Sequence, residues 1–132
     1  MVKITRGNPA NLANVRSNIY NHFVKVENPK AFIFVSGQLS RDKEGQLSGI
    51  GDMAAQTRQA IKNIESVLET AGAKLTDIVQ VVVYTTDMRL FKESCEARME
   101  FFKDPLPTST TVEVQHLTDP LLMIEIQALA VI

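Results

Sequence analysis

The chain has 132 residues, with 14 Lys and Arg against 15 Asp and Glu and a single cysteine. This length suits one domain, over residues 1–132, and the balanced, scattered charge argues against the continuous basic surface that nucleic-acid binding needs. The lone Cys95 has no partner for an internal disulfide, and no apolar stretch has the form of a secretory signal or the length of a membrane span. We therefore expect a cytoplasmic protein without a membrane or nucleic-acid partner.

The first third of the chain is predicted to be rich in strands. Residues 19–26 and 31–39 have the composition of strands, and the turn-forming Glu27-Asn28-Pro29-Lys30 joins them. A polar turn at 41–45 then leads to a short strand at 46–48.

Two helices are predicted in the middle of the chain, where the hydrophobic period changes from two to about 3.6 residues. Asp52 can cap the first helix, whose apolar stripe reaches Ala71, and Gly72 suits the position after its end. Asp87 can cap the second helix, which ends before Asp104-Pro105.

Three further strands are predicted, at 78–86, 108–115 and 121–131. The first of them is dense in Val, Tyr and Thr, which is typical of a strand buried on both faces. Strands and helices that alternate in this way indicate an α+β fold with a mixed sheet of five to six strands and both helices on one face.

The last strand is apolar on both faces, although two helices can cover only one face of such a sheet. One face carries Leu122, Ile124, Ile126, Ala128 and Ala130, and on the other face Leu121, Met123, Leu129 and Val131 flank Glu125 and Gln127. Large exposed apolar patches are unusual on monomers, so we infer a homo-oligomer that buries the open face.

Several motifs resemble the RidA family, also called YjgF or L-PSP. They are Pro107-Thr108-Ser109-Thr110-Thr111-Val112-Glu113-Val114, Met123-Ile124-Glu125-Ile126-Gln127-Ala128, Phe34-Val35-Ser36-Gly37-Gln38, Gln56-Thr57 with Asn63-Ile64, and Ala71-Gly72-Ala73 with Leu75-Thr76-Asp77-Ile78-Val79. The resemblance extends from about Ile19 to the end of the chain. It implies a chorismate-mutase-like fold, a homotrimer with clefts between subunits, and a small-molecule substrate without a cofactor.

Glu125 is the candidate catalytic residue. As a carboxylate in an apolar strand it could simply be satisfied by a backbone N–H or by a cation across an oligomer interface, because leaving it unpaired is costly. The resemblance instead implies that it positions the attacking water, or relays a proton, during imine hydrolysis.

The resemblance also places residues along the cleft. Tyr20 would touch the substrate, although it could be an ordinary aromatic at a strand edge. Ser36, Gly37 and Gln38 could simply form a turn at the end of a strand, but Gly37 would let backbone N–H groups approach a ligand closely. Thr111 would help to shape the same pocket.

Ser109 departs from the family signature, which usually reads Pro-Ala-Arg-Ser/Thr with arginine in this place. In the resembling enzymes that arginine grips the substrate carboxylate through two parallel hydrogen bonds, which serine cannot do. Arg41 and Arg98 are the candidate replacements. Ser40-Arg41, Val114-Gln115-His116-Leu117 and Pro120-Leu121-Leu122-Met123-Ile124-Glu125 are also similar to the aminomuconate-deaminase branch, which acts on an enamine of a dicarboxylate but usually keeps an arginine where Ser109 stands.

Cys95 and Arg98 stand on the predicted second helix, where the resemblance implies cleft-lining residues. By residue type alone, Cys95 is more typical of a small core-facing side chain, since no nearby base is indicated that would make it a nucleophile. His22 and His116 are too far apart to indicate a metal site, so no metal is expected, and His22 could share a face with Tyr20.

The sequence thus predicts a RidA-like deaminase that hydrolyses a small enamine or imine and releases ammonia. The alternative is a non-catalytic homologue that binds or senses a small metabolite, which the missing arginine favours. Ribonuclease activity, attributed to some relatives, is the weakest reading because the chain is neutral and offers no aromatic stacking surface.

Overall fold

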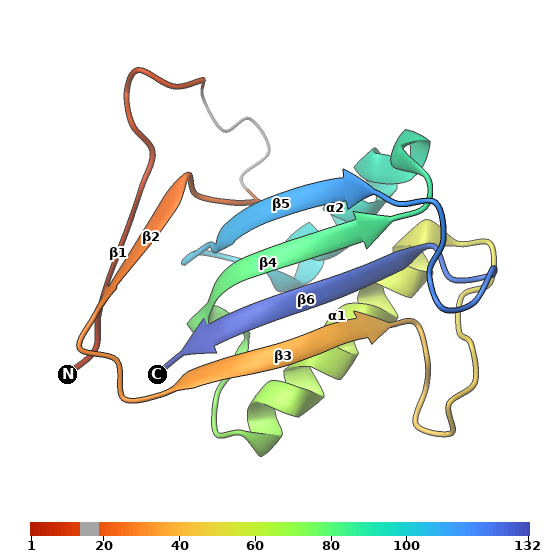
Figure 1. The fold of residues 1–132 in the computed structure, drawn as a ribbon, viewed down its shortest axis with the longest axis horizontal. Helices are drawn as coiled ribbons and strands as arrows, with labels where there is room; N and C mark the ends of the chain where they lie inside the picture. Colours follow the sequence, from red (N-terminus) through yellow and green to blue (C-terminus); the bar gives the residue numbers. More distant parts are fainter. Residues whose placement is uncertain (14–18) are drawn as a thin grey trace.

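The computed structural model describes residues 1–13 and 19–132 (Figure 1). Its main sheet has four strands in the order β3-β6-β4-β5. These are β3 (Phe32–Leu39), β6 (Ile124–Val131), β4 (Ile78–Thr85) and β5 (Thr108–Glu113). Strand β6 runs antiparallel to both of its neighbours, and β4 and β5 are parallel.

Two further strands, β1 (Lys3–Gly7) and β2 (Phe23–Glu27), form a separate antiparallel ribbon at the end of the sheet where β3 begins (Figure 1). The predicted single sheet of five to six strands is therefore wrong in this detail, since the described strands divide into four and two. Asn28 adopts the left-handed conformation, with φ of 56°, between β2 and β3. The chain changes direction at this turn, and the strands on its two sides belong to different sheets.

Two predicted strand boundaries also change. The strand expected over 19–26 begins only at Phe23, because Asn21 and His22 use their backbone N–H groups to bond Pro107 and the side chain of Asn8. The strand expected at 46–48 is a single bridge between Arg41 and Leu47.

Both main helices, α1 (Met53–Thr70) and α2 (Phe91–Phe101), cover one face of the sheet, as predicted (Figure 1). Asp52 caps α1 by accepting a hydrogen bond from Ala55 N at 3.0 Å. Gly72, with φ of 81°, follows the end of the helix. Asp87 caps the short 3-10 turn Met88–Leu90 that precedes α2 rather than α2 itself.

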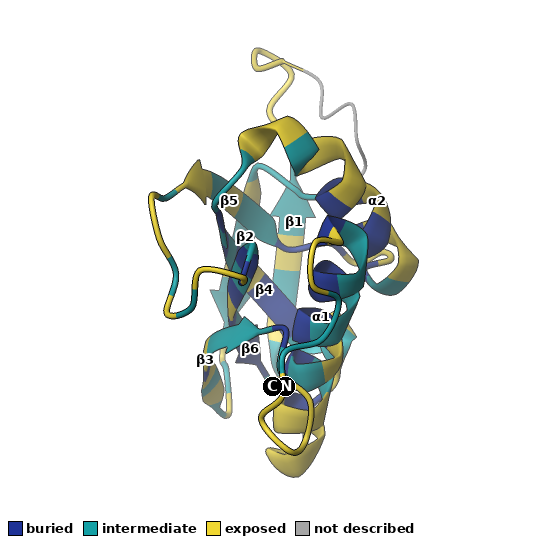
Figure 2. Cartoon of the chain, turned by 90° about the vertical axis from the view of Figure 1, so that its right-hand side faces the viewer, coloured by how far each residue is buried: buried dark blue, intermediate teal, exposed yellow. Residues whose placement is uncertain are grey.

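The core lies between this helical layer and the sheet (Figure 2). Ile61, Ile64 and Leu68 of α1 are fully buried, as are Ile124 and Ile126 of β6. The other face of the sheet carries exposed aromatic residues, with Phe32 56% and Phe34 80% exposed. Within the described part of the chain, no helix has the length and apolar character required to cross a bilayer.

Gln56 is a fully buried polar side chain that ties α1 to the segment before β6. Its Nε2 donates to Leu121 O at 2.9 Å and to Gly49 O at 3.3 Å, and its Oε1 accepts from Met123 N at 2.8 Å. One buried side chain therefore satisfies three backbone groups from two separate segments of the chain.

We expect Gln56→Ala to lower the free energy of unfolding by roughly 2 to 4 kcal/mol, because it creates a cavity and removes those three bonds. Urea denaturation at one fixed protein concentration measures the change, with the exposed Lys62→Ala on the same helix as the control. A loss for Gln56→Ala no larger than that of the control would contradict the anchoring role.

Candidate active site

Glu125 lies against Gly37 on the face of the sheet that no helix covers. Ile124 and Ile126 are buried under α1, so the side chain between them points to the opposite face. A Cβ atom added to Gly37 would lie 2.8 Å from Cδ and 2.9 Å from Cγ of Glu125. Only glycine therefore leaves room for the carboxylate on the backbone of β3.

The approach is made possible by a bulge in β3. The β3–β6 register shifts between Val35, opposite Ala128, and Gln38, opposite Ile126, so Ser36 and Gly37 form the extra length. Ser36 is exposed, and its carbonyl accepts a hydrogen bond from Gln38 Nε2 at 3.1 Å. Gly37 was expected to permit a close approach, and the group that approaches is the candidate catalytic carboxylate of the same chain.

Tyr84 is a neighbour that the sequence motifs did not single out. It stands directly opposite Glu125 in the β4–β6 pairing and is partly exposed. Cross-strand partners project from the same face of a sheet. In the sequence, only the alternation of side chains along Val82, Val83 and Tyr84 could have indicated which face of the sheet Tyr84 occupies. No hydrogen bond or ion pair joins Glu125 to another described residue.

Arg98 and Ser109 form a second cluster, on the helical side of the sheet. The guanidinium of Arg98 on α2 is buried, and its Nη2 donates to Ser109 Oγ on β5 at 2.9 Å. Its Nε is buried without a hydrogen-bond partner among the described residues. Desolvation by burial lowers the pKa of Arg98. Thr111 shares this face, two residues farther along β5.

Cys95 lies one turn before Arg98 and is buried. Burial raises the pKa of its thiol, which disfavours the thiolate that a nucleophile needs. The environment is therefore that of the core-facing side chain that its residue type indicated, not that of an activated cysteine.

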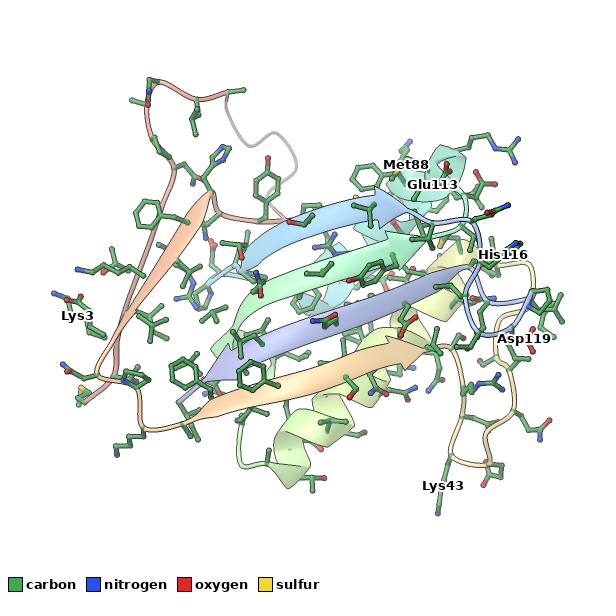
Figure 3. The ribbon with its side chains drawn as sticks, in the orientation of Figure 1. Lys3, Lys43, Met88, Glu113, His116 and Asp119 are labelled. Atoms are coloured by element: carbon green, nitrogen blue, oxygen red, sulfur yellow. The ribbon has the colours of Figure 1, made fainter. Side chains whose placement is uncertain are left out.

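Arg41, the other candidate cation, lies elsewhere. It follows β3, at the opposite edge of the sheet from β5, where its Nη1 donates to Gly45 O at 2.9 Å and its Nη2 faces Asp119 Oδ2 at 3.9 Å. Figure 3 shows Lys43 of the same loop far from Glu113 at the end of β5. Of these two candidate cations, Arg98 is the one that contacts Ser109 within the chain.

Tyr20 lies near the start of β5. The next residue, Asn21, donates from its backbone N to Pro107 O at 2.8 Å and from Nδ2 to Leu106 O at 2.9 Å. The ring of Tyr20 meets that of His22 edge to face, with 5.6 Å between centroids. The two aromatic side chains therefore form one small group, as their spacing suggested.

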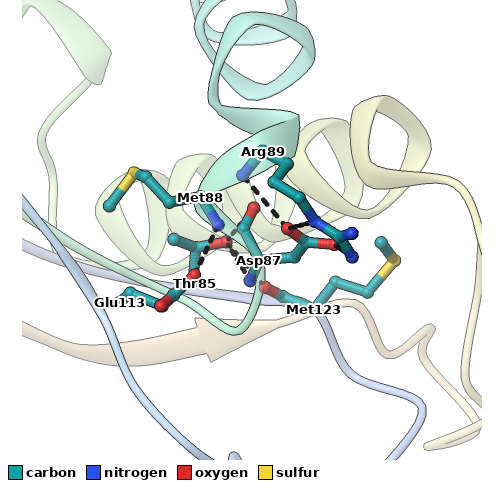
Figure 4. A network of polar contacts seen from close by, with 6 residues as sticks. All are labelled: Thr85, Asp87, Met88, Arg89, Glu113 and Met123. Atoms are coloured by element: carbon teal, nitrogen blue, oxygen red, sulfur yellow. Dashed lines mark hydrogen bonds and ion pairs between the residues drawn. The ribbon is translucent and has the colours of Figure 1, made fainter.

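A polar network connects the 3-10 turn Met88–Leu90, which precedes α2, to the end of β5 (Figure 4). Glu113, the last residue of β5, accepts a hydrogen bond from Met88 N at 2.8 Å. Asp87 accepts from Arg89 N at 3.0 Å and pairs with its guanidinium, and that hydrogen bonding lowers the pKa of Asp87. The bond to Glu113 thus ties the segment just before α2 to the end of the strand that carries Ser109.

The predicted site residues therefore occupy both faces of the sheet. Glu125 and Gly37 lie on the open face, whereas Ser109 and Arg98 contact each other on the helical side. A single chain does not bring these two clusters together.

An α+β architecture with two helices on one face of a mixed sheet is the class of fold found in solved Rid proteins. A Rid family protein of unknown function from Yersinia pestis, YyfB, matches with a TM-score of 0.89 at 27% identity over 98% of both chains. Escherichia coli TdcF, solved with bound serine, matches with a TM-score of 0.72 at 28% identity over 78% of this chain and 82% of its own.

Sequence comparison gives the family directly. The model described as Endoribonuclease L-PSP matches residues 13–132. A RutC family protein of Pyrococcus abyssi is 40% identical over 111 residues, which are 84% of each chain. The chain belongs to the RidA/YjgF/L-PSP family.

The contact between Gly37 and Glu125 predicts a strong coupling of the two positions. The backbone of Gly37 is not in the left-handed region, and the three atoms nearest to an alanine Cβ there all belong to Glu125. We expect Gly37→Ala to destabilise the protein by about 1 to 3 kcal/mol through overpacking, and to cost much less in a Glu125→Ala background. A double-mutant cycle by urea denaturation measures this, and equal effects in both backgrounds would contradict the contact.

Proposed function

We propose that the protein hydrolyses a small imine or enamine, releasing ammonia, at a cleft between subunits of a homotrimer. The observation that carries the proposal is Glu125, a half-buried carboxylate that lies on the open face without a partner among the described residues. A carboxylate in this state can take up and return a proton. Family membership and the serine bound by TdcF support a small substrate of the amino-acid kind.

The need for a second chain follows from the two faces of the sheet. The exposed Phe32 and Phe34 indicate that the open face is covered in the assembled protein. A neighbouring copy seated there can bring its Ser109 cluster toward Glu125 of the first chain. The cleft would then contain residues of both faces, from two subunits.

Hydrolysis of an imine requires few catalytic groups. Glu125 orients a water molecule beside the C=N carbon and accepts its proton while the oxygen adds to that carbon. That proton passes to nitrogen and gives a carbinolamine. Glu125 then takes the proton of the new hydroxyl group and returns it to nitrogen as the C–N bond breaks, which leaves a carbonyl compound and ammonia. Orientation and proton transfer are the main contributions, so no cofactor is required.

RNA cleavage, which the printed name of the family model suggests, fits this chain less well. The formal net charge is −1, and several basic side chains already face carboxylates. Lys25 pairs with Glu27 at 3.1 Å, and Arg58 with Glu100 at 2.7 Å. These pairs reduce the positive potential that a polyanion would need.

A non-catalytic metabolite-binding protein is the second candidate. Ser109 favours it, because the arginine-bearing signature is absent at that position. The two candidates share the cleft and differ in what Glu125 does.

Assembly is tested by light scattering coupled to gel filtration. We expect a trimer at micromolar concentration, and we expect Phe34→Asp to dissociate it, because it places charge in a buried apolar interface. Val67→Asp, which puts the same change on the outer side of α1, serves as the control and should leave the trimer intact. A monomeric wild-type protein would contradict the interfacial cleft.

Catalysis is tested by Glu125→Gln, which keeps the shape of the side chain but removes the proton acceptor. We expect turnover to fall by roughly a hundred-fold or more, with the trimer unchanged. Imines generated in situ by an amino-acid oxidase, with semicarbazide as the competing trap, give the rate, and Glu69→Gln on α1 is the control. Equal turnover by Glu125→Gln and the wild type would contradict the catalytic role of Glu125, and a wild-type rate no higher than the uncatalysed rate would favour the binding protein.

A further inference from the structure

A polar cavity lies between helix α1 and the loop that follows β3. One wall is formed by the end of β3 and this loop, from Gln38 to Gly45, and the other by α1 from Gln59 to Ser66. Figure 3 shows Lys43 at the outer turn of the loop. The volume is about 720 Å³, which is within the range of about 300 to 1,000 Å³ that small-molecule sites occupy. Because α1 covers the helical side of the sheet, the trimer proposed above leaves this cavity open.

Hydrogen bonds hold the two walls in place without a ligand. Asn63 on α1 donates from Nδ2 to the carbonyl oxygens of Leu39 and Arg41, both at 2.9 Å. Within the loop, Asp42 Oδ1 accepts two backbone hydrogen bonds, each at 2.9 Å. A preformed site loses less conformational freedom on binding than one that must order itself around its ligand.

The cavity carries an excess of positive charge. Arg41, Lys43 and Lys62 line it, and Asp42 is the one acid among its described lining residues, which leaves an excess of two positive charges. Neither lysine forms an ion pair within residues 1–13 and 19–132. Arg41 Nη2 lies 3.9 Å from Asp119 Oδ2, which is too far for a hydrogen bond. All three cations therefore keep donors for a bound anion.

The size of this excess indicates a phosphate group. A phosphate monoester carries about 1.5 to 2 negative charges at pH 7, close to the two positive charges of the cavity. A carboxylate carries one negative charge and would leave the site unbalanced. Lysine binds phosphate as a point charge, and arginine presents several N–H donors to its oxygens.

The rest of the cavity suits hydroxyl groups. Gln59 Nε2 donates to Asn63 Oδ1 at 2.9 Å, and Gln38 Nε2 donates to Ser36 O at 3.1 Å. These bonds leave the amide oxygens of both glutamines as acceptors for hydroxyl donors. The described lining includes no aromatic side chain, so a nucleobase would find no surface on which to stack.

We propose that this cavity is a binding site for a phosphorylated sugar. Arg41, Lys43 and Lys62 hold the phosphate, and the amide oxygens of Gln38 and Gln59 accept hydrogen bonds from sugar hydroxyl groups. The site is separate from Glu125 and involves no covalent step. It does not rest on the proposed deaminase activity.

A matched pair of probes tests the site in the full-length protein. Glucose 6-phosphate and glucose differ only in the phosphate, and isothermal titration calorimetry measures the binding of each. We expect glucose 6-phosphate to bind at least about ten-fold more tightly, because several charge-assisted hydrogen bonds hold the phosphate. Added salt should narrow this difference, since the cations are near the surface. Equal binding of the two sugars, or no binding of glucose 6-phosphate at millimolar concentration, would overturn the proposal.

Variants locate the binding. The side chains of Lys43 and Lys62 are exposed, so replacing them leaves the core intact. Lys43→Gln and Lys62→Gln should each weaken glucose 6-phosphate binding several-fold, and the double variant should lose most of the preference over glucose. Lys92→Gln makes the same change of charge at an exposed position of α2 and should bind as the wild type does. An unchanged preference in the double variant would refute this location.

Three further measurements separate other ligands and another location. Inorganic phosphate that bound as tightly as glucose 6-phosphate would show that the hydroxyl groups contribute nothing, and it would overturn the choice of a sugar. Adenosine monophosphate that bound more tightly would overturn it in favour of a nucleotide. Glu125→Gln should bind glucose 6-phosphate as the wild type does. A loss of binding in that variant would place the ligand on the open face of the sheet and refute this site.

Discussion

Strand β6 lies between β3 and β4, and the alternation of its side chains arranges the rest of the molecule. Four of them, Ile124, Ile126, Ala128 and Ala130, enter the core beneath the helices. A slip of one residue in register would bury Glu125 and expose these four. Full burial of each isoleucine alone contributes about 1.5 to 3 kcal/mol. The packing of the core thus also decides where the carboxylate lies, and the bulge at Gly37 gives it room.

The two faces of the sheet carry complementary charges that the chain itself keeps apart. Within residues 1–13 and 19–132, Glu125 forms no ion pair with a cation and Arg98 forms none with a carboxylate. Pairing them within one subunit would have neutralised both and left nothing to act on a ligand. Separation by the sheet preserves both charges.

Local signals in the sequence predicted most of the fold. The cap at Asp52, the glycine at Gly72 and the apolar stripe between them predicted α1, because these features depend on neighbours within a few residues. Strand β1 was missed, since Lys3–Gly7 has little apolar character and becomes a strand only by pairing with β2. Arg98 and Ser109 were both predicted as site residues, but their direct contact depends on how α2 crosses β5. Tyr84 was not predicted as a neighbour of Glu125 for the same reason, because only the β4–β6 register places the two residues opposite each other.

The exposed phenylalanines of β3 also affect how prone the newly synthesised chain is to aggregate. Phe32 and Phe34 stand on an edge strand whose outer backbone groups have no partner strand in the described sheet. An edge of this kind invites the addition of strands from other molecules, which leads to aggregation. In the proposed trimer, the exposed phenylalanines are covered once a chain has met its own copies, so aggregation competes with assembly while chains are unfinished. Translation of many copies close together would favour assembly in that competition, so the proposed trimer makes the rate of synthesis a factor in whether the chain aggregates.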